Sequence, residues 1–174
     1  MKSRALLWLG LLASLNLLGG CAGGPDLNAQ PFFTPATDVR ADQATLYFYR
    51  ATATIGYGIA PAIKINGKTI SSLPSGGYFK THLPAGTYRI DSTSPPLITN
   101  MVNKHFDLKV ENGQTYYIAD QISTSPFNDG LTLGAVDDGS FGRTRYYFRY
   151  ALLPEEQALR SIQWCRQVPT PQAP

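Results

Sequence analysis

The sequence predicts an all-β protein, an antiparallel sandwich of about seven to nine short strands with one short C-terminal helix. Three observations predict this fold. Segments between residues 44 and 150 alternate apolar and polar side chains with a period of two, which is typical of half-buried strands. Turn-forming sequences such as Asn66-Gly67 separate these segments at short intervals. A helical period is found only after Pro154.

Residues 1–20 are expected to be a secretory signal peptide. Lys2 and Arg4 form a basic start, and residues 5–18 form an apolar run that is shorter than the ~20 residues of a membrane-spanning helix. The small residues Gly19 and Gly20 then suit a cleavage site.

The motif Leu18-Gly19-Gly20-Cys21 resembles the bacterial lipobox. The resemblance implies cleavage between Gly20 and Cys21, a diacylglycerol on the Cys21 sulfur and a fatty acid such as palmitate on its new amine. An ordinary signal peptide with a cysteine nearby by chance is the alternative. Ala22 follows, and the lipoprotein sorting pattern without Asp at this position implies the outer membrane of a double-membrane bacterium, facing the periplasm.

The charge of the chain argues against a nucleic-acid partner. The chain has 15 Lys and Arg residues and 12 Asp and Glu residues, and two of the basic ones lie in the expected signal peptide. The remaining chain therefore has 13 basic and 12 acidic residues, a net charge of +1. It contains no basic cluster, and an exported location also argues against nucleic acid.

The two cysteines, Cys21 and Cys165, are not expected to pair, because a lipidated Cys21 cannot form a disulfide. Ala158, Leu159, Ile162 and Cys165 share one face at helical spacing. This spacing predicts that the Cys165 thiol is buried against the sandwich. Pairing with another chain is the alternative.

Residues 21–43 are expected to form the lipidated cysteine and a flexible tether, because they are rich in Gly, Pro and polar residues and have no regular period. Phe32 and Phe33 interrupt the tether, and they contact either the domain's own surface or lipid near the anchor. The sandwich domain with its helix is predicted over residues 44–166, and a disordered tail over residues 167–174.

Residues 44–50 form the first predicted strand. Leu46 and Phe48 share one face, while Tyr47 and Tyr49 share the other. Large side chains on both faces predict a central strand, or a strand whose second face is covered by another element.

Residues 62–90 predict consecutive hairpins. The Asn66-Gly67 turn is expected to place Ile63 opposite Ile70. A strand through Phe79 then reaches a turn at Pro84-Ala85-Gly86, where Gly86 is expected to have a positive φ, and the next strand contains Tyr88.

The alternation continues through residues 105–110, 115–119 and 131–135, each a predicted strand. Residues 137–143 are predicted to be a turn, and residues 145–150 a final aromatic strand. Pro154, followed by Glu155 and Glu156, predicts the first turn of the helix.

The sequence contains no motif specific for catalysis, metal or cofactor binding, so we expect none of the three. His82 and His105 occupy polar strand positions without a second ligand at metal-binding spacing. The sequences 128–130 and 137–139 lack the acidic oxygens of a calcium loop, and turn chemistry explains them better.

Aromatic residues exceed what one core face requires. Such side chains suit interfaces and sugar platforms, so they form a candidate interaction surface. The alternative is that the second sheet and the helix cover both faces. The candidate residues are Tyr47, Tyr49, Tyr146, Phe148 and Tyr150.

Several motifs occur in a recognisable order: ATLYFYR from Ala44, INGK from Ile65, GGYF from Gly76, LPAGTYRI from Leu83, NGQTYYI from Asn112, and a late Leu-x-x-Ile-x-x-Cys-Arg helix. Together they resemble the domain-of-unknown-function 2846 family of small bacterial envelope proteins, many of them lipoproteins. The resemblance covers residues 44–166. It implies a β-sandwich and an envelope location, and it supplies no catalytic residues.

LPAGTY also resembles the Leu-Pro-x-Gly-x-Tyr turn of transthyretin-like and other immunoglobulin-like sandwiches, which implies a sandwich of that kind. In such turns a Tyr hydroxyl commonly bonds a nearby backbone group, and this is the role expected of Tyr88.

These observations leave two function classes open. The first is a non-enzymatic, lipid-anchored module that binds another envelope component, protein or glycan. The second is an envelope enzyme whose site is built from scattered loop residues. The first is preferred, because no nucleophile–base motif is present in the sequence.

Overall fold

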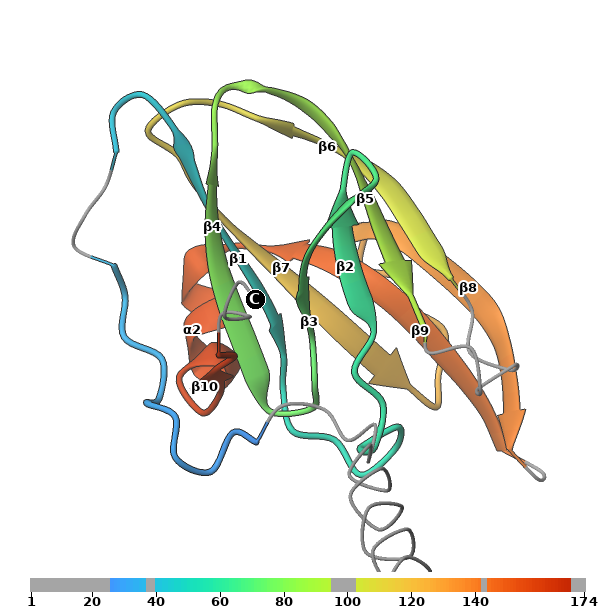
Figure 1. The fold of residues 1–174 in the computed structure, drawn as a ribbon. Coiled ribbons are helices and arrows are strands. Elements are labelled where there is room, and N and C mark those ends of the chain that lie inside the picture. Colours follow the sequence, from blue (N-terminus) through green and yellow to red (C-terminus); the bar gives the residue numbers. More distant parts are fainter. Residues whose placement is uncertain (1–25, 37–39, 95–102, 142–143, 170–174) are drawn as a thin grey trace, which may run out of the picture.

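The computed structural model describes residues 26–36, 40–94, 103–141 and 144–169. The expected lipidation site, Cys21, its cleavage partner Gly20 and the last five residues lie outside this range. The described residues form two packed sheets and a short helix (Figure 1). The elements are β1 Ala44–Arg50, β2 Ala62–Ile65, β3 Lys68–Ser72, β4 Gly77–Leu83, β5 Gly86–Thr93, β6 Lys104–Val110, β7 Thr115–Ser123, β8 Thr132–Phe141, β9 Thr144–Leu153, α2 Glu155–Ile162 and β10 Arg166–Gln167.

The predicted all-β sandwich with a C-terminal helix is confirmed. The larger sheet has the strand order β10-β4-β1-β7-β9-β8, and the smaller sheet has the order β3-β2-β5-β6. The smaller sheet is antiparallel, but the larger sheet is mixed, because β1 pairs in parallel with β7 and β4 in parallel with β10. A parallel neighbour requires a long crossover, and here the chain visits the smaller sheet between β1 and β7.

The main core lies between the two sheets and is built by alternate residues of each strand. Leu46 and Phe48 of β1 are fully buried, as are Ile63 of β2 and Ile90 of β5. The Phe48 ring stacks on Phe79 of β4 with centroids 5.1 Å apart. The period-two pattern of the sequence therefore identifies the inward faces correctly.

A second apolar cluster covers the outer face of the larger sheet. Tyr47 and Tyr49 of β1 lie in it, together with Ala158 and Ile162 of α2 and the adjacent Cys165. Figure 1 shows α2 lying against this sheet on the side opposite the smaller sheet. Both faces of β1 are thus covered, which was one of the two arrangements expected for it.

Part of the segment expected to be a tether packs on the domain. Phe33 is 8% exposed, and its ring lies edge-on to Tyr47 and Tyr78, with centroids 5.2 Å away in each case. Phe32 forms an isolated antiparallel bridge with Arg166 and stays 49% exposed. Phe33 therefore contacts the domain's own surface. The packing also extends past the expected boundary at residue 166, because Val168 is buried.

The turn chemistry of the first hairpin is confirmed, but its register is not. Asn66 has φ 49° and Gly67 has φ 81°, as a tight hairpin turn of this type requires. The expected Ile63–Ile70 pair is wrong, because Ile63 pairs with Ser71. A β-bulge after Ile63 shifts the register by one residue, and a bulge cannot be read from alternation alone.

The turn before β5 is stabilised by Tyr88, as expected. The Tyr88 hydroxyl donates a hydrogen bond to the Pro84 carbonyl oxygen at 3.0 Å. The positive φ expected for Gly86 is wrong, because its φ lies outside the left-handed region. A Cβ on Gly86 would meet the Tyr88 ring at 3.4 Å, which is ordinary contact. Neither the backbone conformation nor the space at this position therefore requires a glycine.

The predicted turn at residues 137–143 is also partly wrong. β8 continues to Phe141, and its register with β9 shifts between Val136 and Gly139. The Asp137-Asp138-Gly139 sequence therefore lies within an irregular strand. Turn-forming residues also suit bulges, so composition alone does not separate the two.

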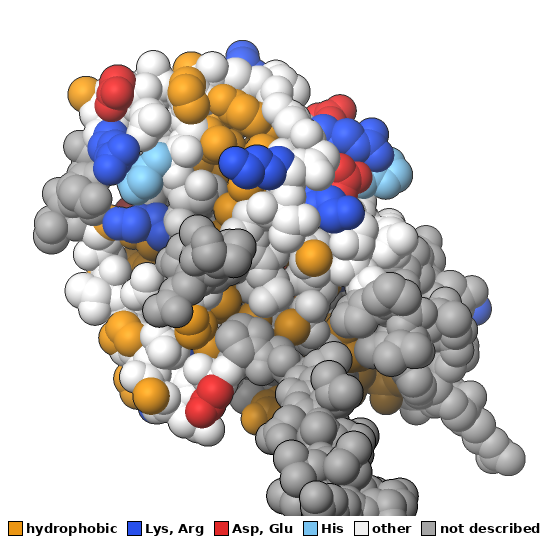
Figure 2. All heavy atoms as spheres, in the orientation of Figure 1, with side chains coloured by type: hydrophobic (Ala, Val, Ile, Leu, Met, Phe, Trp, Pro, Cys, Tyr) orange, Lys and Arg blue, Asp and Glu red, His pale blue; other side chains and the backbone are white. Residues whose placement is uncertain are grey.

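The outer face of the smaller sheet is charged. His105, Asp107 and Lys109 of β6 are exposed, as is Arg89 of β5. Figure 2 shows basic, acidic and histidine side chains gathered over these two strands. The two signs alternate, as on an ordinary solvated sheet face.

Cys165 is buried behind α2, as the helical spacing predicts. It is 1% exposed, and its sulfur lies 3.6 Å from the Arg50 carbonyl oxygen. Burial raises the pKa of the thiol to about 12. We expect slow maleimide labelling of Cys165 in the native protein and rapid labelling after denaturation, because the thiolate is the reactive species.

The labelled peptide would be identified by mass spectrometry, which separates Cys165 from Cys21. The variant Gln163→Cys, at an exposed position two residues away, provides the control for reagent access. Labelling of native Cys165 as fast as that of the control cysteine would contradict the burial.

Candidate functional site

Three charged side chains are buried together at one end of the sandwich. Arg50 ends β1, Asp120 lies in β7 and Lys104 begins β6. Each continues the inward-facing register of its strand, two residues beyond Phe48, Ile118 or Phe106. Their side chains are only 6%, 7% and 6% exposed, respectively.

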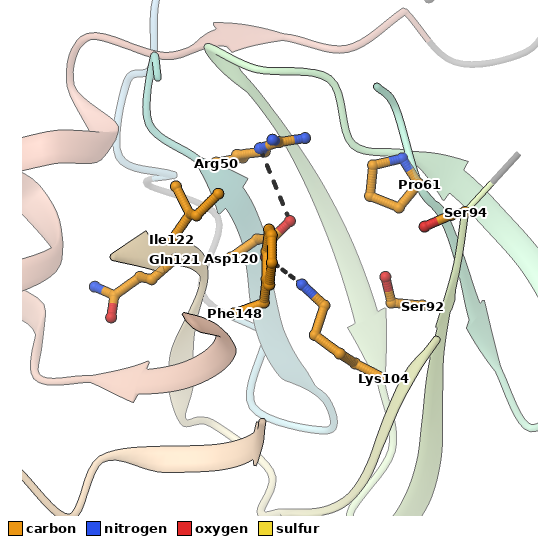
Figure 3. Close-up of a pocket in the computed structure, with 9 residues that line it drawn as sticks. All are labelled: Arg50, Pro61, Ser92, Ser94, Lys104, Asp120, Gln121, Ile122 and Phe148. Carbon is orange, nitrogen blue, oxygen red and sulfur yellow. Dashed lines mark hydrogen bonds and ion pairs between the residues drawn. The ribbon is translucent and has the colours of Figure 1, made fainter. Parts of the chain in front are cut away.

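The three side chains point toward one another in Figure 3, with Asp120 between the two cations. The Lys104 Nζ atom lies 2.8 Å from Asp120 Oδ1, and the Arg50 Nε atom lies 3.9 Å from Asp120 Oδ2. Lys104 belongs to the smaller sheet, and Asp120 and Arg50 to the larger. This ionic triad therefore connects the two layers of the sandwich.

Arg50 also holds the loop that follows it. Its Nη1 donates to the Ile59 carbonyl oxygen at 2.8 Å, and its Nη2 donates to the Gly56 and Ile55 carbonyl oxygens at 3.1 and 3.4 Å. Gly56 has φ 69°, and a Cβ there would lie 2.7 Å from Arg50 Nη2. The guanidinium thus fixes a loop in which glycine is required.

Lys104 lies among aromatic rings. Its Nζ atom is 4.8 Å from the Tyr150 ring centroid and 5.6 Å from that of Phe148, within cation–π range. The Tyr150 hydroxyl donates to Ser92 Oγ at 3.1 Å. Burial, and then the Asp120 carboxylate, raise the pKa of Tyr150 well above its usual value. The raised pKa keeps the proton on the tyrosine, which donates a hydrogen bond to Ser92.

The space beside the triad is small. A cavity of about 20 Å³ is lined by the three charged side chains and by Ser92, Ser94 and Phe148, among others. This is room for about one water molecule. Every buried polar side-chain atom in the described residues has a hydrogen-bond partner. Among the described residues, the triad is thus a hydrogen-bonded network that supports the fold.

A larger groove lies on the outer face of the larger sheet. It encloses about 230 Å³ between residues 31–34, β4 and β10. Tyr47 and Tyr78, which are 2% and 6% exposed, form its floor, and the more exposed Phe32 forms a wall. The remaining lining residues are Pro31, Thr34, Lys80 and Gln167.

The groove is held in shape by contacts within the chain. The Tyr47 hydroxyl accepts a hydrogen bond from the Ala36 amide at 2.9 Å, and its ring stacks on Tyr117 at 5.3 Å. The Phe32 wall is fixed by the Arg166 guanidinium, 4.0 Å above its ring centroid. Lys80 is the charged residue among these lining residues. The aromatic floor and polar rim of the groove are typical of ligand sites.

The aromatic surface expected from the sequence does not exist in that form. Tyr47 and Tyr49 are buried under α2 and Phe33, while Phe148 and Tyr150 face the sheet interface. Tyr146 is half-buried. The two aromatic strands belong to a sheet that is covered on both faces, and this explains the burial of Tyr47, Tyr49, Phe148 and Tyr150. Of the five candidate residues, Tyr47 lines the groove.

A buried arginine fixes the loop between β7 and β8. Arg149 forms a bidentate pair with Asp129 and bonds Gln121 Oε1 at 2.8 Å and Thr132 Oγ1 at 3.1 Å. The hydrogen bonds from Arg149 are the main cause that lowers the pKa of Asp129 to about 2. The predicted turn at 128–130 is thus correct, with Gly130 at φ 71°.

This pair predicts a pH dependence of stability. Because the folded pKa of Asp129 lies below the usual 3.8, its contribution is fully present above the unfolded pKa and is lost as the pH falls toward about 2. We expect the difference in unfolding free energy between wild type and Asp129→Asn to be constant near neutral pH and to shrink below about pH 4. Urea melts at stepped pH would measure it. A difference that stays unchanged down to pH 2 would contradict the assignment.

The described residues contain no group of three or more His, Cys, Asp or Glu side chains placed to hold a metal ion. Nor does any helix among them have the length and apolarity to cross a bilayer.

The fold and these sites define a β-sandwich with the ionic triad between its sheets and an aromatic groove on the outer face of its larger sheet. The model of a family described as proteins of unknown function, DUF2846, matches residues 40–135, which is more than half of the chain. The chain belongs to this family. The match includes the strands that carry Arg50, Lys104 and Asp120, and it ends before β9 and α2. No curated protein and no solved structure matches the chain.

Proposed function

We propose that this protein is a lipid-anchored envelope module that binds another envelope component, protein or glycan, without catalysing a reaction. The observation that carries the proposal is the groove of about 230 Å³ with its aromatic floor and polar rim. Its walls are ordered by the protein's own contacts before any ligand arrives, which reduces the cost of binding.

The charged groups support a binding role over catalysis. Inside the sandwich Asp120 pairs with both Arg50 and Lys104, and the space beside them holds about one water molecule. A catalytic acid or base needs access to a substrate proton. The groove is more accessible, and Tyr side chains, an amide and one Lys are among the residues that line it.

The anchor is tested by Cys21→Ser. Cells would be fed an alkyne-labelled fatty acid, and the label on the wild-type protein should be lost in the variant. Because acyl chains contribute about 0.8 kcal/mol per buried methylene, the unlipidated variant should also leave the membrane fraction. Label that persists in Cys21→Ser would overturn the anchor, and with it the expected outer-membrane location.

The groove is tested by a photo-crosslinking amino acid placed in intact cells at Thr34 or Gln167, both exposed groove residues. The same amino acid at Thr87, on the outer face of the smaller sheet, is the matched control. Adducts that form from the groove positions but not from the control position support the proposal. Lysozyme treatment then distinguishes glycan adducts from protein adducts. Identical adducts from groove and control positions would overturn it.

A further inference from the structure

Two large aromatic side chains, Phe32 in the groove wall and Trp164 in the turn after α2, are exposed and take no part in either core. Phe32 is 49% exposed and Trp164 is 68% exposed. Cys165 and Phe33 point inward from the same two segments and are buried. Phe32, Trp164 and Arg166 are called the outer aromatic patch below.

The backbone explains why these side chains face outward. The Phe33 amide donates to the Cys165 carbonyl oxygen at 2.9 Å, and the Gln167 amide donates to the Pro31 carbonyl oxygen at 2.9 Å. These bonds flank the Phe32–Arg166 bridge and pair the two side chains on one face. Since neighbouring residues in extended chain alternate, Phe32 faces solvent beside buried Phe33. Trp164 lies in the turn between α2 and β10, two residues before Arg166, and is also exposed.

The composition of the patch suits the interface of a phospholipid bilayer. Trp and Phe rings lie favourably at the level of lipid headgroups, where apolar and polar surroundings meet. The Arg166 guanidinium lies over the Phe32 ring, and this cation would attract anionic headgroups.

The length of chain before the patch limits its distance from the proposed anchor. Eleven residues lead from Cys21 to Phe32, and at ~3.6 Å per residue they span at most about 40 Å in any conformation. The patch therefore stays close to the leaflet in which Cys21 would be anchored. Of the exposed aromatic residues Phe32, Tyr57 and Trp164, Phe32 is the nearest to Cys21 in sequence.

We propose that the outer aromatic patch rests on the anionic phospholipid leaflet that holds the lipid anchor, and so orients the domain with its groove beside the membrane. This inference rests on the proposed lipidation of Cys21. It adds a second contact with lipid, formed by the folded domain.

The test uses Trp164 as its own reporter. The sequence has two tryptophans, and Trp8 lies in the expected signal peptide, so Trp164 is the single tryptophan of the processed protein. The full-length lipoprotein would be purified and reconstituted in mixed phosphatidylcholine and phosphatidylglycerol vesicles. Bromine atoms on the acyl chains quench tryptophan only at short range. We expect brominated vesicles to remove most of the Trp164 fluorescence.

Two variants complete the experiment. In Trp164→Phe combined with Thr87→Trp, the reporter lies on the opposite face, and its fluorescence should be the same in brominated and plain vesicles. In Phe32→Glu, the patch carries a negative charge, and the quenching of Trp164 should fall to the level of that control. Slow labelling of Cys165 by maleimide would verify that each variant is folded.

Flotation of the vesicles separates the two proposals. Protein that does not float with the vesicles overturns the lipid anchor and this inference together. Protein that floats with unquenched Trp164 leaves the anchor intact and overturns the patch. Trp164 that is shielded from a soluble quencher but not quenched by bromine would assign the patch to a second copy of the chain, which also overturns the lipid contact.

Discussion

Replacement of Asp120 by alanine should destabilise the domain by about 3–5 kcal/mol, because it leaves two buried cations without their counter-charge. Asp120 is the only anion that the structure places between Arg50 and Lys104 in the described residues. Lys104 would lose its 2.8 Å contact while it remains 6% exposed. Urea denaturation of wild type and variant would measure the loss.

The exposed pair Arg89–Asp91 supplies the matched control. Its Nε–Oδ1 distance is 3.2 Å, but the two side chains are 57% and 25% exposed. Asp91→Ala should therefore cost only about 0–1 kcal/mol, as is usual for surface ion pairs. Equal losses for Asp120→Ala and Asp91→Ala would show that the triad is not desolvated in solution.

Replacement of Gly134 by alanine should destabilise the domain by about 3 kcal/mol, at the upper end of the range for overpacking. A Cβ at this position would lie 2.6 Å from the His105 carbonyl oxygen, so the backbone of β8 or β6 must move. Figure 1 shows β8 alongside the end of β6, where the edge of the larger sheet approaches the smaller one. The free energy of unfolding, from urea melts, would measure the effect.

Gly58→Ala is the control for the change in backbone entropy. A Cβ at Gly58 would meet no atom within 4 Å, and its φ lies outside the left-handed region. This variant should be neutral or stabilising by up to about 1 kcal/mol. If Gly134→Ala were as stable as Gly58→Ala, the close approach of β8 to β6 would be wrong.

Local patterns predicted the elements well. The first strand begins and ends at Ala44 and Arg50 as expected, and the helix follows Pro154. The Asn66-Gly67 turn and the Tyr88–Pro84 hydrogen bond also follow from neighbouring residues. These features depend on backbone preferences and on contacts within a few residues, and both can be predicted from neighbouring residues in the sequence.

Features that join distant segments were not predicted. The parallel β1–β7 pair depends on a partner far along the chain, and so does the choice between the two contacts expected for Phe33. The tyrosines of β1 illustrate the consequence. Their size predicted either a covered face or an exposed surface, and only the position of α2 decides between them.

The buried triad shows most clearly the difference between what local sequence patterns predict and what depends on tertiary contacts. The alternation of residues in three strands already places Arg50, Asp120 and Lys104 on inward faces, two positions beyond core residues. That signal was available, but it does not say that the three strand ends meet. The sequence by itself determined which residues of each strand face the main core, because side-chain direction follows from strand geometry. Only the tertiary structure decided that the buried charges neutralise one another, because ion pairing depends on distances between strands that the chain brings together across two sheets.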